Sequence, residues 1–509
     1  MSTWFERATN PFIAFITKHP WLAMLASACL LAACLAGAPK LRTNFTYTAF
    51  YQHDDPQLLS FQRFERTFGN DDAVVLVVHS PSGIFDVESA RLLRDLTERM
   101  WQLPEVIRVD SLANFQWVHA SGDDVVSEPL LPPEGALTPA LLAERQKVAL
   151  SHELLPGYLI SDDGKTGMLY ARLKPGLDGP TDSRLIAAKA HELVLDFAGG
   201  DHSFHLTGEP IVADAFRAVS SQDTGLLVPL LLGTVALLLF VVFRAVAATV
   251  LPTLVILATV LGAVVSSGHL GLELSSLSMS LPQVLIAVCL GDAVHLLAGF
   301  FRARKAGFTR RESATHTLKK NLVATLLTTL TTAIGFASFV TASLLPIQGF
   351  GLLAALGTVL AWLFTYLLVG AALTLWPGKD PAGRADGREG LDSEPLLRAT
   401  PRSIGFVEWV NRRRFGIVAC WLVLSVGALT LVLDVGVNSN PYQHFSRQVP
   451  VRQAHDFLVE HVSGATAFEL VIDSGREEGI KDPEFLRRVE RFEAEALTLP
   501  GIHKAISIV

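Results

Sequence analysis

Long runs of apolar residues alternate with polar stretches along this chain of 509 residues. Each run is long enough to cross the ~30 Å hydrocarbon core of a bilayer as one helix, which takes about 20 residues. The pattern therefore predicts an integral membrane protein with seven spans, at residues 20–38, 223–243, 246–266, 282–301, 321–343, 350–376 and 415–433.

The polar region between the first two runs predicts a folded domain that mixes strands and helices. An apolar stretch of strand length at 73–80 is followed by helical periodicity at 87–103 and again at 181–198. The stretches YLIS and GMLYARLK flank Asp162-Asp163-Gly164, which is a hairpin turn signal. This alternation indicates split β-α-β modules packed on one sheet.

The charges between the runs predict the orientation of the chain. The loop at residues 302–320 carries seven Lys and Arg side chains against the single acid Glu312. By the positive-inside rule this loop is cytoplasmic. Counting spans from it places the N-terminus in the cytoplasm and the chain after residue 434 outside, and Lys18 and Arg412-Arg413-Arg414 agree.

Three short features recur in the same order near the C-terminus. Tyr51-Gln52-His53 recurs as Tyr442-Gln443-His444, the strand at 73–80 recurs at 467–474, and the helix at 87–103 recurs at 482–499. We interpret them as the start of a second copy of a span-plus-domain unit, so that the complete form of a truncated or partial chain holds about 12 spans. The alternative is that two generic strand–helix–strand units look alike.

These patterns divide the chain into six predicted parts. They are the N-terminal cytoplasmic segment with the first span (1–38), an extracytoplasmic domain (39–222), a five-span membrane bundle (223–376), a cytoplasmic linker (377–414), the seventh span (415–434) and the start of a second extracytoplasmic domain (435–509).

Composition narrows the class of protein. Half of the residues are hydrophobic and only 18% are charged, whereas soluble domains carry about a quarter charged residues. The net charge of −7 comes without a basic face, so we expect no nucleic-acid partner. All four cysteines lie inside apolar runs, so no disulfide framework is expected in the domains.

One acidic side chain, Asp292, interrupts the apolar run at 282–301. It precedes Arg302 by about 15 Å of helix, roughly half of the hydrocarbon core, so its carboxyl is predicted near the midplane. A charge there costs on the order of 2.5–3.5 kcal/mol. We interpret Asp292 as a proton-relay group; the alternative is a permanently neutral structural acid that is hydrogen-bonded to a neighbour.

Other polar residues of the spans are candidates for the same pathway. His295 lies one turn after Asp292 and either takes part in the relay or bonds across a helix interface. Four threonines of the next span share a helical face, and they either line the relay or bond locally to their own backbone. These threonines are Thr325, Thr328, Thr329 and Thr332.

The chain lacks the motifs of several enzyme classes. We find no phosphate-cradling glycine loop, nucleophile elbow or metalloprotease motif, so we expect neither an enzyme nor a cofactor. The stretches His202-Ser203-Phe204-His205 and His53-Asp54-Asp55 lack the spacing and partners of a zinc site, so no metal is expected either.

The stretch GDAVHLLAGFFRARKAGFTRRESATHTLKKNLVATLLTTLTTAIGFASF (291–339) resembles the RND superfamily of proton-driven exporters, most closely its MmpL-like and Patched-like branch. The order of one span, a large external domain and five further spans extends the likeness over nearly the whole chain. The resemblance implies a polytopic α-helical membrane protein with porter-like α+β extracytoplasmic domains and a duplicated architecture whose second repeat is incomplete. Spans two to six also resemble a sterol-sensing domain.

The resemblance further implies a function and its partners. We expect export of a lipid or other hydrophobic molecule across the cytoplasmic (inner) membrane, driven by proton antiport through Asp292. Membrane lipids and periplasmic or outer-membrane proteins are the expected partners. Two alternatives stay open: a receptor or sensor that binds sterol-like lipid without pumping, and an accessory protein for protein translocation.

Overall fold

The computed structural model divides the chain into two compact units. The membrane unit comprises Met1–His53 and Arg217–Asn438, and the sheet unit comprises Asp54–Phe216 and Ser439–Val509. The C-terminal stretch thus belongs to the same unit as the polar region that follows the first span. The structure describes residues 2–52, 54–69, 72–132, 137–174, 182–197, 200–377, 401–433, 435–436, 440–462 and 468–509.

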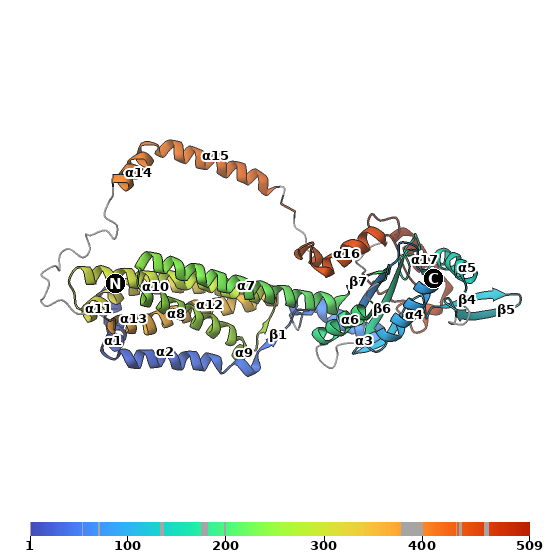
Figure 1. Cartoon of the computed structure of the whole chain (residues 1–509), viewed down its shortest axis with the longest axis horizontal. Coiled ribbons are helices and arrows are strands. Elements are labelled where there is room, and N and C mark those ends of the chain that lie inside the picture. The colour runs from blue at the N-terminus through green and yellow to red at the C-terminus, as the bar shows by residue number, and fades with distance from the viewer. Residues whose placement is uncertain are drawn as a thin grey trace. The chain divides into compact units, whose positions relative to one another are not determined.

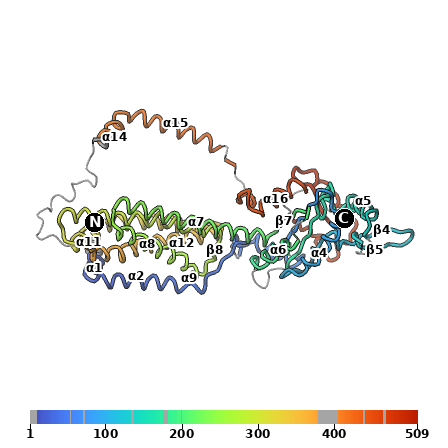
Figure 2. The backbone as a smooth tube through the Cα atoms, viewed as in Figure 1, coloured from blue at the N-terminus to red at the C-terminus, as the bar shows by residue number. Residues whose placement is uncertain are grey.

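The membrane unit is built from helices (Figures 1 and 2). Over the described residues, seven helical segments have the length and hydropathy to cross a membrane, as the sequence predicted. The helices are α1 (Ser2–Lys18), α2 (Pro20–Leu35), α7 (Glu209–Phe243), α8 (Val246–Val265), α9 (Ser267–Leu270), α10 (Leu281–Lys305), α11 (Arg310–Ala337), α12 (Leu345–Phe364), α13 (Gly370–Thr374), α14 (Pro401–Arg412) and α15 (Arg414–Val432).

Large aromatic side chains and small residues together pack the centre of this bundle. Phe300, Phe364 and Tyr366 are fully buried. A Cβ atom at Gly357 would lie 2.6 Å from the Leu285 side chain, so α12 and α10 approach each other closely at that point. Small residues allow such contacts between membrane helices, where dispersion between well-packed surfaces drives association.

The basic loop predicted at 302–320 is mostly helical. α10 continues to Lys305 and α11 already begins at Arg310, which leaves only a short turn between them. Thr309 and Glu312 form a reciprocal capping box that satisfies the first backbone N–H groups of α11. The span pattern missed this because the helix continues beyond its apolar part, where capping rather than hydrophobicity sets the boundary.

A short clasp joins the end of the first span to the connection before the fourth. Strand β1 (Arg42–Thr43) pairs in parallel with β8 (Glu273–Leu274). The Asn44 side-chain amide donates to a Glu273 carboxylate oxygen at 2.9 Å, and the Asn44 backbone N–H donates to the Leu274 carbonyl. The clasp fixes these two segments of the membrane unit to each other.

The sheet unit has the predicted split β-α-β arrangement. Its four strands lie in the order β3-β6-β2-β7, and every neighbouring pair is antiparallel. β2 and β3 are joined through α4 and flank β6, and β6 and β7 are joined through α6 and flank β2. The bounds are β2 (Ala73–His79), α4 (Val87–Met100), β3 (Val106–Asp110), β6 (Thr166–Leu173), α6 (Ser183–Phe197) and β7 (Ser203–Thr207).

Helices cover both faces of this sheet (Figure 1). Leu93 of α4 packs beside Gly167 of β6 on one face. On the opposite face Leu458, from the distant helix α16 (Pro450–His461), packs with Val77 and Met168. The unit also contains α3 (Pro56–Phe68), the hairpin β4 (Gln116–Ser121) and β5 (Asp124–Pro129), α5 (Pro139–Ser151) and α17 (Pro483–Ala496).

Two predicted strands are wrong in this structure. Residues 468–474, the described part of the predicted strand 467–474, form neither helix nor strand. A strand requires pairing with a neighbour, and the described strands of the sheet pair with one another instead. YLIS is reduced to two isolated bridges at Ile160, to Pro156 and to Gly167, although the turn after it does form. His53 and the linker residues 378–400 lie outside the described part of the chain.

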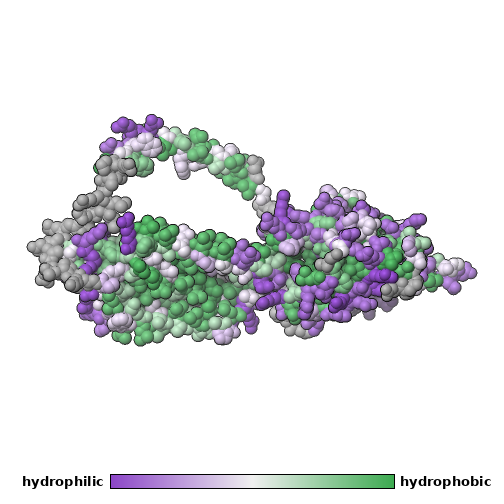
Figure 3. Space-filling view, viewed as in Figure 1, coloured by the Kyte–Doolittle hydropathy of each residue, from purple (hydrophilic) through white to green (hydrophobic). Residues whose placement is uncertain are grey.

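The two units differ in surface chemistry. The visible face of the α7–α12 bundle is mostly hydrophobic, and that of the sheet unit is mostly hydrophilic (Figure 3). Large apolar side chains such as Leu230 and Leu237 of α7 are more than half exposed. Such a continuous apolar exterior is stable in lipid rather than in water.

Candidate functional site

The acid and histidine singled out in the sequence lie on one side of α10. Asp292 is half-buried, and His295, one turn later, is exposed. The opposite side of α10 is packed into the bundle through Ile286, Ala293 and Leu297. The helix thus turns its polar residues away from its buried apolar side.

These polar residues line a pocket of about 370 Å³ within the membrane unit. Its walls come from α10, α11 and α12, which contact one another. All six residues singled out in the sequence lie in its wall, together with residues that the sequence did not indicate. The complete lining is Val288, Gly291, Asp292, His295, Asn321, Ala324, Thr325, Thr328, Thr329, Thr332 and Thr358.

The Asp292 carboxyl makes no hydrogen bond to any residue that the structure describes, and it shares the pocket wall with His295. If Asp292 were a structural acid held by a hydrogen bond to a neighbour, that neighbour would not be among the described residues. A carboxyl of this kind can exchange a proton without first breaking a protein hydrogen bond.

The four threonines of α11 have different environments. The Thr325 hydroxyl lies 2.8 Å from the Tyr366 hydroxyl and also accepts from Trp362 Nε1 at 3.2 Å. The Thr328 hydroxyl donates to the Thr325 backbone carbonyl at 2.9 Å. The hydroxyls of Thr329 and Thr332 make no hydrogen bond within the described residues, and both side chains line the pocket. Local backbone bonding, the alternative interpretation of these threonines, thus holds for Thr328 and also for Thr325, whose hydroxyl donates to the Asn321 carbonyl at 3.0 Å.

Comparison with known proteins then identifies the family. The sequence profile described as the MMPL family matches residues 58–408, more than half of the chain. The chain belongs to the MMPL family. It is accordingly a multi-pass membrane transporter of the RND/MmpL type with α+β domains outside the membrane. A comparison with curated proteins gives no match.

The match to the MMPL family spans the features that build the pocket. It contains the four-stranded sheet, all of α7–α12 and every residue of the pocket lining. It ends before α15, α16 and α17. The polar pocket therefore belongs to the part of the chain that defines this protein as an MMPL transporter.

Four residues at or behind the pocket wall of this MMPL protein were missed in the sequence. Asn321 lies one turn before Thr325 on the same helical face, so its spacing could have revealed it. Thr358, Trp362 and Tyr366 come from the sixth span and its continuation, and a single-helix pattern cannot show which helix they face. Tyr366 carried one signal, since it is the only tyrosine in the seven predicted spans.

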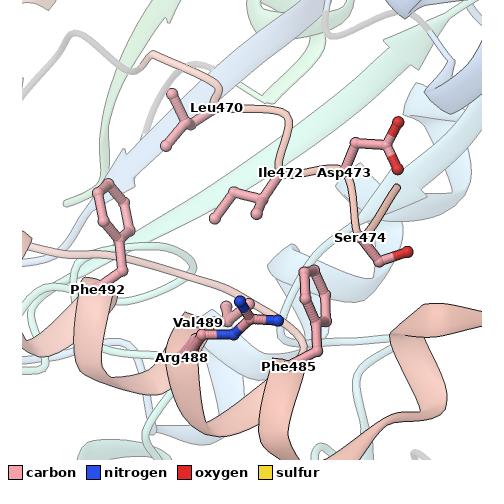
Figure 4. Close-up of a pocket in the computed structure, with 8 residues that line it drawn as sticks. All are labelled: Leu470, Ile472, Asp473, Ser474, Phe485, Arg488, Val489 and Phe492. Atoms are coloured by element: carbon pink, nitrogen blue, oxygen red, sulfur yellow. The ribbon is translucent and has the colours of Figure 1, made fainter. Parts of the chain in front are cut away.

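A second hollow, of about 390 Å³, lies in the sheet unit. Phe485, Val489 and Phe492 of α17 face Leu470 and Ile472 across it (Figure 4). The lining is mainly apolar because α17 is strongly amphipathic and turns its apolar face toward residues 470–474. Asp473 and Arg488 are its only charged lining residues.

Aromatic and histidine rings cluster where α16 contacts the sheet. Phe457 stacks between His205 and His461, with ring centroids 4.4 and 4.2 Å away, and His79 lies edge-on at 5.4 Å. Burial, followed by the neighbouring His461, lowers the pKa of His79. Burial and the neighbouring His79 lower the pKa of His205. All of these rings belong to the sheet unit.

The histidines of the stretch 202–205 have structural surroundings. His202 Nε2 lies 2.8 Å from the Ser89 hydroxyl, and His205 stacks on Phe457. Over the described residues, no three His, Cys, Asp or Glu side chains come close enough together to hold a metal ion.

Proposed function

We propose that this MMPL transporter exports a lipid or other hydrophobic molecule across the cytoplasmic membrane, and that proton antiport through Asp292 drives the export. The observation that carries the proposal is the pocket itself. The one acid of an otherwise apolar span opens into a cavity walled by hydroxyl groups and an imidazole, and it makes no hydrogen bond within the described chain.

The low dielectric of the bundle gives the proton its effect. A charged carboxylate is costly in such surroundings unless polar groups compensate it, whereas the neutral acid is not. Taking up a proton therefore changes which helix arrangement around the pocket is favoured, and this couples protonation to a shift between two conformations. A charge that crosses 100 mV supplies about 2.3 kcal/mol.

The continuous helix α7 supports the proposed coupling. It follows β7 directly after Gly208 and runs for 35 residues through the second span. In the membrane unit, Val235 and Leu239 of α7 pack with Ile286 and Cys289 of α10, close to the proton site in sequence. A shift of α10 would thus move a helix that begins at the edge of the sheet.

The test replaces Asp292 with its neutral isostere. Asp292→Asn is expected to abolish export of a fluorescent phospholipid driven by a pH gradient in proteoliposomes, with folding and membrane level unchanged. Asp223→Asn, which removes an exposed carboxylate from α7, is the matched control and is expected to export normally. Retained export in Asp292→Asn would end the relay hypothesis.

The same preparation separates the alternatives. A sensor keeps binding the phospholipid after the gradient is collapsed and never moves it, whereas a pump stops moving it. An accessory protein for protein translocation shows neither property, and its depletion produces a secretion defect instead.

A further inference from the structure

The hydroxyl group of Thr325 has all of its hydrogen-bonding capacity in use. Trp362 Nε1 lies 3.2 Å away and can only donate, and the backbone carbonyls of Asn321 and Leu322, at 3.0 and 3.3 Å, can only accept. Because the single Thr325 proton is directed at these carbonyls, the Tyr366 hydroxyl, at 2.8 Å, is assigned as a donor to Thr325. Both lone pairs and the single proton of Thr325 are therefore engaged.

A hydroxyl in this state is unsuited to carrying a proton. It has no free lone pair to accept one from Asp292, and its own proton points back to the carbonyls of α11. The available hydroxyls of the pocket are those of Thr329 and Thr332, which lie one and two turns further along the helix. Thr325 instead joins α11 to the helix opposite.

The two donors to Thr325 are themselves firmly held. Tyr366 is fully buried, and its ring lies 4.8 Å from that of Trp362. Phe12 of the N-terminal helix α1 stacks on Trp362 at 5.8 Å with an interplanar angle of 14°. The neighbours Ile13 and Ile16 of α1 are buried in the same bundle core, so α1 supports the aromatic pair from behind.

The backbone around Tyr366 is unusual as well. Residues Thr365–Val369 form a π-helical turn between α12 and α13. π-Helical turns are rare, and they frequently occur at functional sites. This turn lies on the segment that carries the hydroxyl donor to Thr325.

We propose that Tyr366 and Trp362 are positioning residues that fix the α11 wall of the Asp292 pocket through Thr325, and that Phe12 of α1 holds this aromatic pair in place. The pocket then keeps Thr329 and Thr332 directed at the proton site while α10 moves. The role of this wall in proton transfer rests on the proposed function. The way in which the wall is held rests on the hydrogen bonds and ring contacts alone.

The test removes the two hydrogen-bond donors and keeps an aromatic ring at each position. In nanodiscs, the double variant Tyr366→Phe with Trp362→Phe is expected to speed amide hydrogen exchange in residues 321–332 by about tenfold or more, the effect of two lost hydrogen bonds. Its pH profile of phospholipid export is expected to shift. Thr325→Val should do the same, and Thr325→Ser, which keeps the hydroxyl, should restore both properties.

Trp376→Phe is the matched control. Trp376 packs on Phe300 and Phe301, and its indole N–H makes no hydrogen bond within the described chain. Equal acceleration of exchange in this control, or unchanged exchange in the double variant, would overturn the inference. Faster exchange with an unaltered pH profile would also overturn it, because the contact would then be structural only. Retained export in Asp292→Asn rejects the proposed function and leaves the exchange result standing.

Discussion

Gly208 is the residue at which the sheet gives way to the long helix α7. Its φ is +102°, and a Cβ atom there would overlap the carbonyl oxygen of Ala73 in β2. Gly69, at the end of α3, has a similar φ of +97° but open space around the position of its Cβ. Substitutions at these two glycines can therefore distinguish the cost of backbone strain from the cost of a steric clash.

Gly208→Ala is expected to destabilise the full chain by roughly 2–5 kcal/mol, since a left-handed conformation and an overpacked contact add together. Gly69→Ala should lose only about 1–2 kcal/mol, because only the conformational cost remains. Thermal unfolding of the purified protein in detergent measures both. Equal losses of stability in the two variants would show that the Ala73 carbonyl can move aside at little cost.

The threonines of α11 give a second prediction for single residues. Thr329→Val and Thr332→Val are each expected to lower gradient-driven phospholipid export by about tenfold, as for a lost hydrogen bond to a charged group. Thr328→Val should stay near wild type because its hydroxyl donates to its own helix. A Thr328 variant as damaged as the Thr329 variant would contradict this distinction.

For single residues, helical spacing was sufficient to predict part of the site. Asp292 with His295, and the threonines with one another, are three or four residues apart, so one helix alone places them on a common face. Thr358, Trp362 and Tyr366 belong to another helix. Which helix faces which depends on packing of small residues such as Gly357 against Leu285, and the apolar periodicity of a span does not encode that pairing.

At the scale of elements, we expect the docking of α16 on the sheet to be strongest when the neighbouring histidines are neutral. His79 and His205 have pKa values below the ordinary 6.5, and burial is the main cause. The neighbouring His461 lowers the pKa of both histidines. Lys165 also lowers the pKa of His79, whereas Asp163 raises it. Uncharged rings are therefore favoured when α16 is docked.

The sign of the pH effect follows from these lowered values. Above the ordinary histidine pKa, both the docked and the undocked form are neutral, so docking is at full strength. As the pH falls through 6.5 toward the lowered pKa values, the undocked form binds protons that the docked form excludes, and docking weakens. We expect α16 to exchange its amide hydrogens faster, relative to intrinsic rates, at about pH 5.5 than at about pH 7.5.

The variant His205→Phe retains a ring on Phe457 and removes one titrating group, so it should reduce this pH dependence. His191→Phe changes an exposed histidine of α6 and serves as the control. Hydrogen exchange of residues 450–461 is the measurement. A pH dependence that is the same in wild type and His205→Phe would show that docking does not respond to this histidine.

The elements of the sheet unit were predictable where their signals are local. Strands β2, β3, β6 and β7 alternate with α4 and α6, and alternating periodicity is visible in the sequence. The segment 468–474 has the same apolar character, yet it forms no strand, because a strand also needs a pairing partner. The docking of α16 on β7 joins residues distant in the chain, and no local pattern indicates it.

At the scale of the whole molecule, the seven spans and the basic segment at 302–320 determine how the chain is expected to cross the membrane. In a background with all four cysteines replaced by alanine, Ser127→Cys in the hairpin should react with a membrane-impermeant maleimide in intact cells. Lys319→Cys on α11 should react only after the cells are opened, because basic segments stay in the cytoplasm. The reverse labelling pattern would invert the proposed topology and the direction of export.

The clasp between β1 and β8 also has a consequence for biosynthesis. Asn44 and Glu273, which it joins, are separated by 229 positions. At a ribosomal rate of about 5–20 residues per second, roughly 10–50 s pass between the synthesis of these two residues. The segment that follows α2 is therefore made well before the segment that holds it, and α2 spends that interval without this contact.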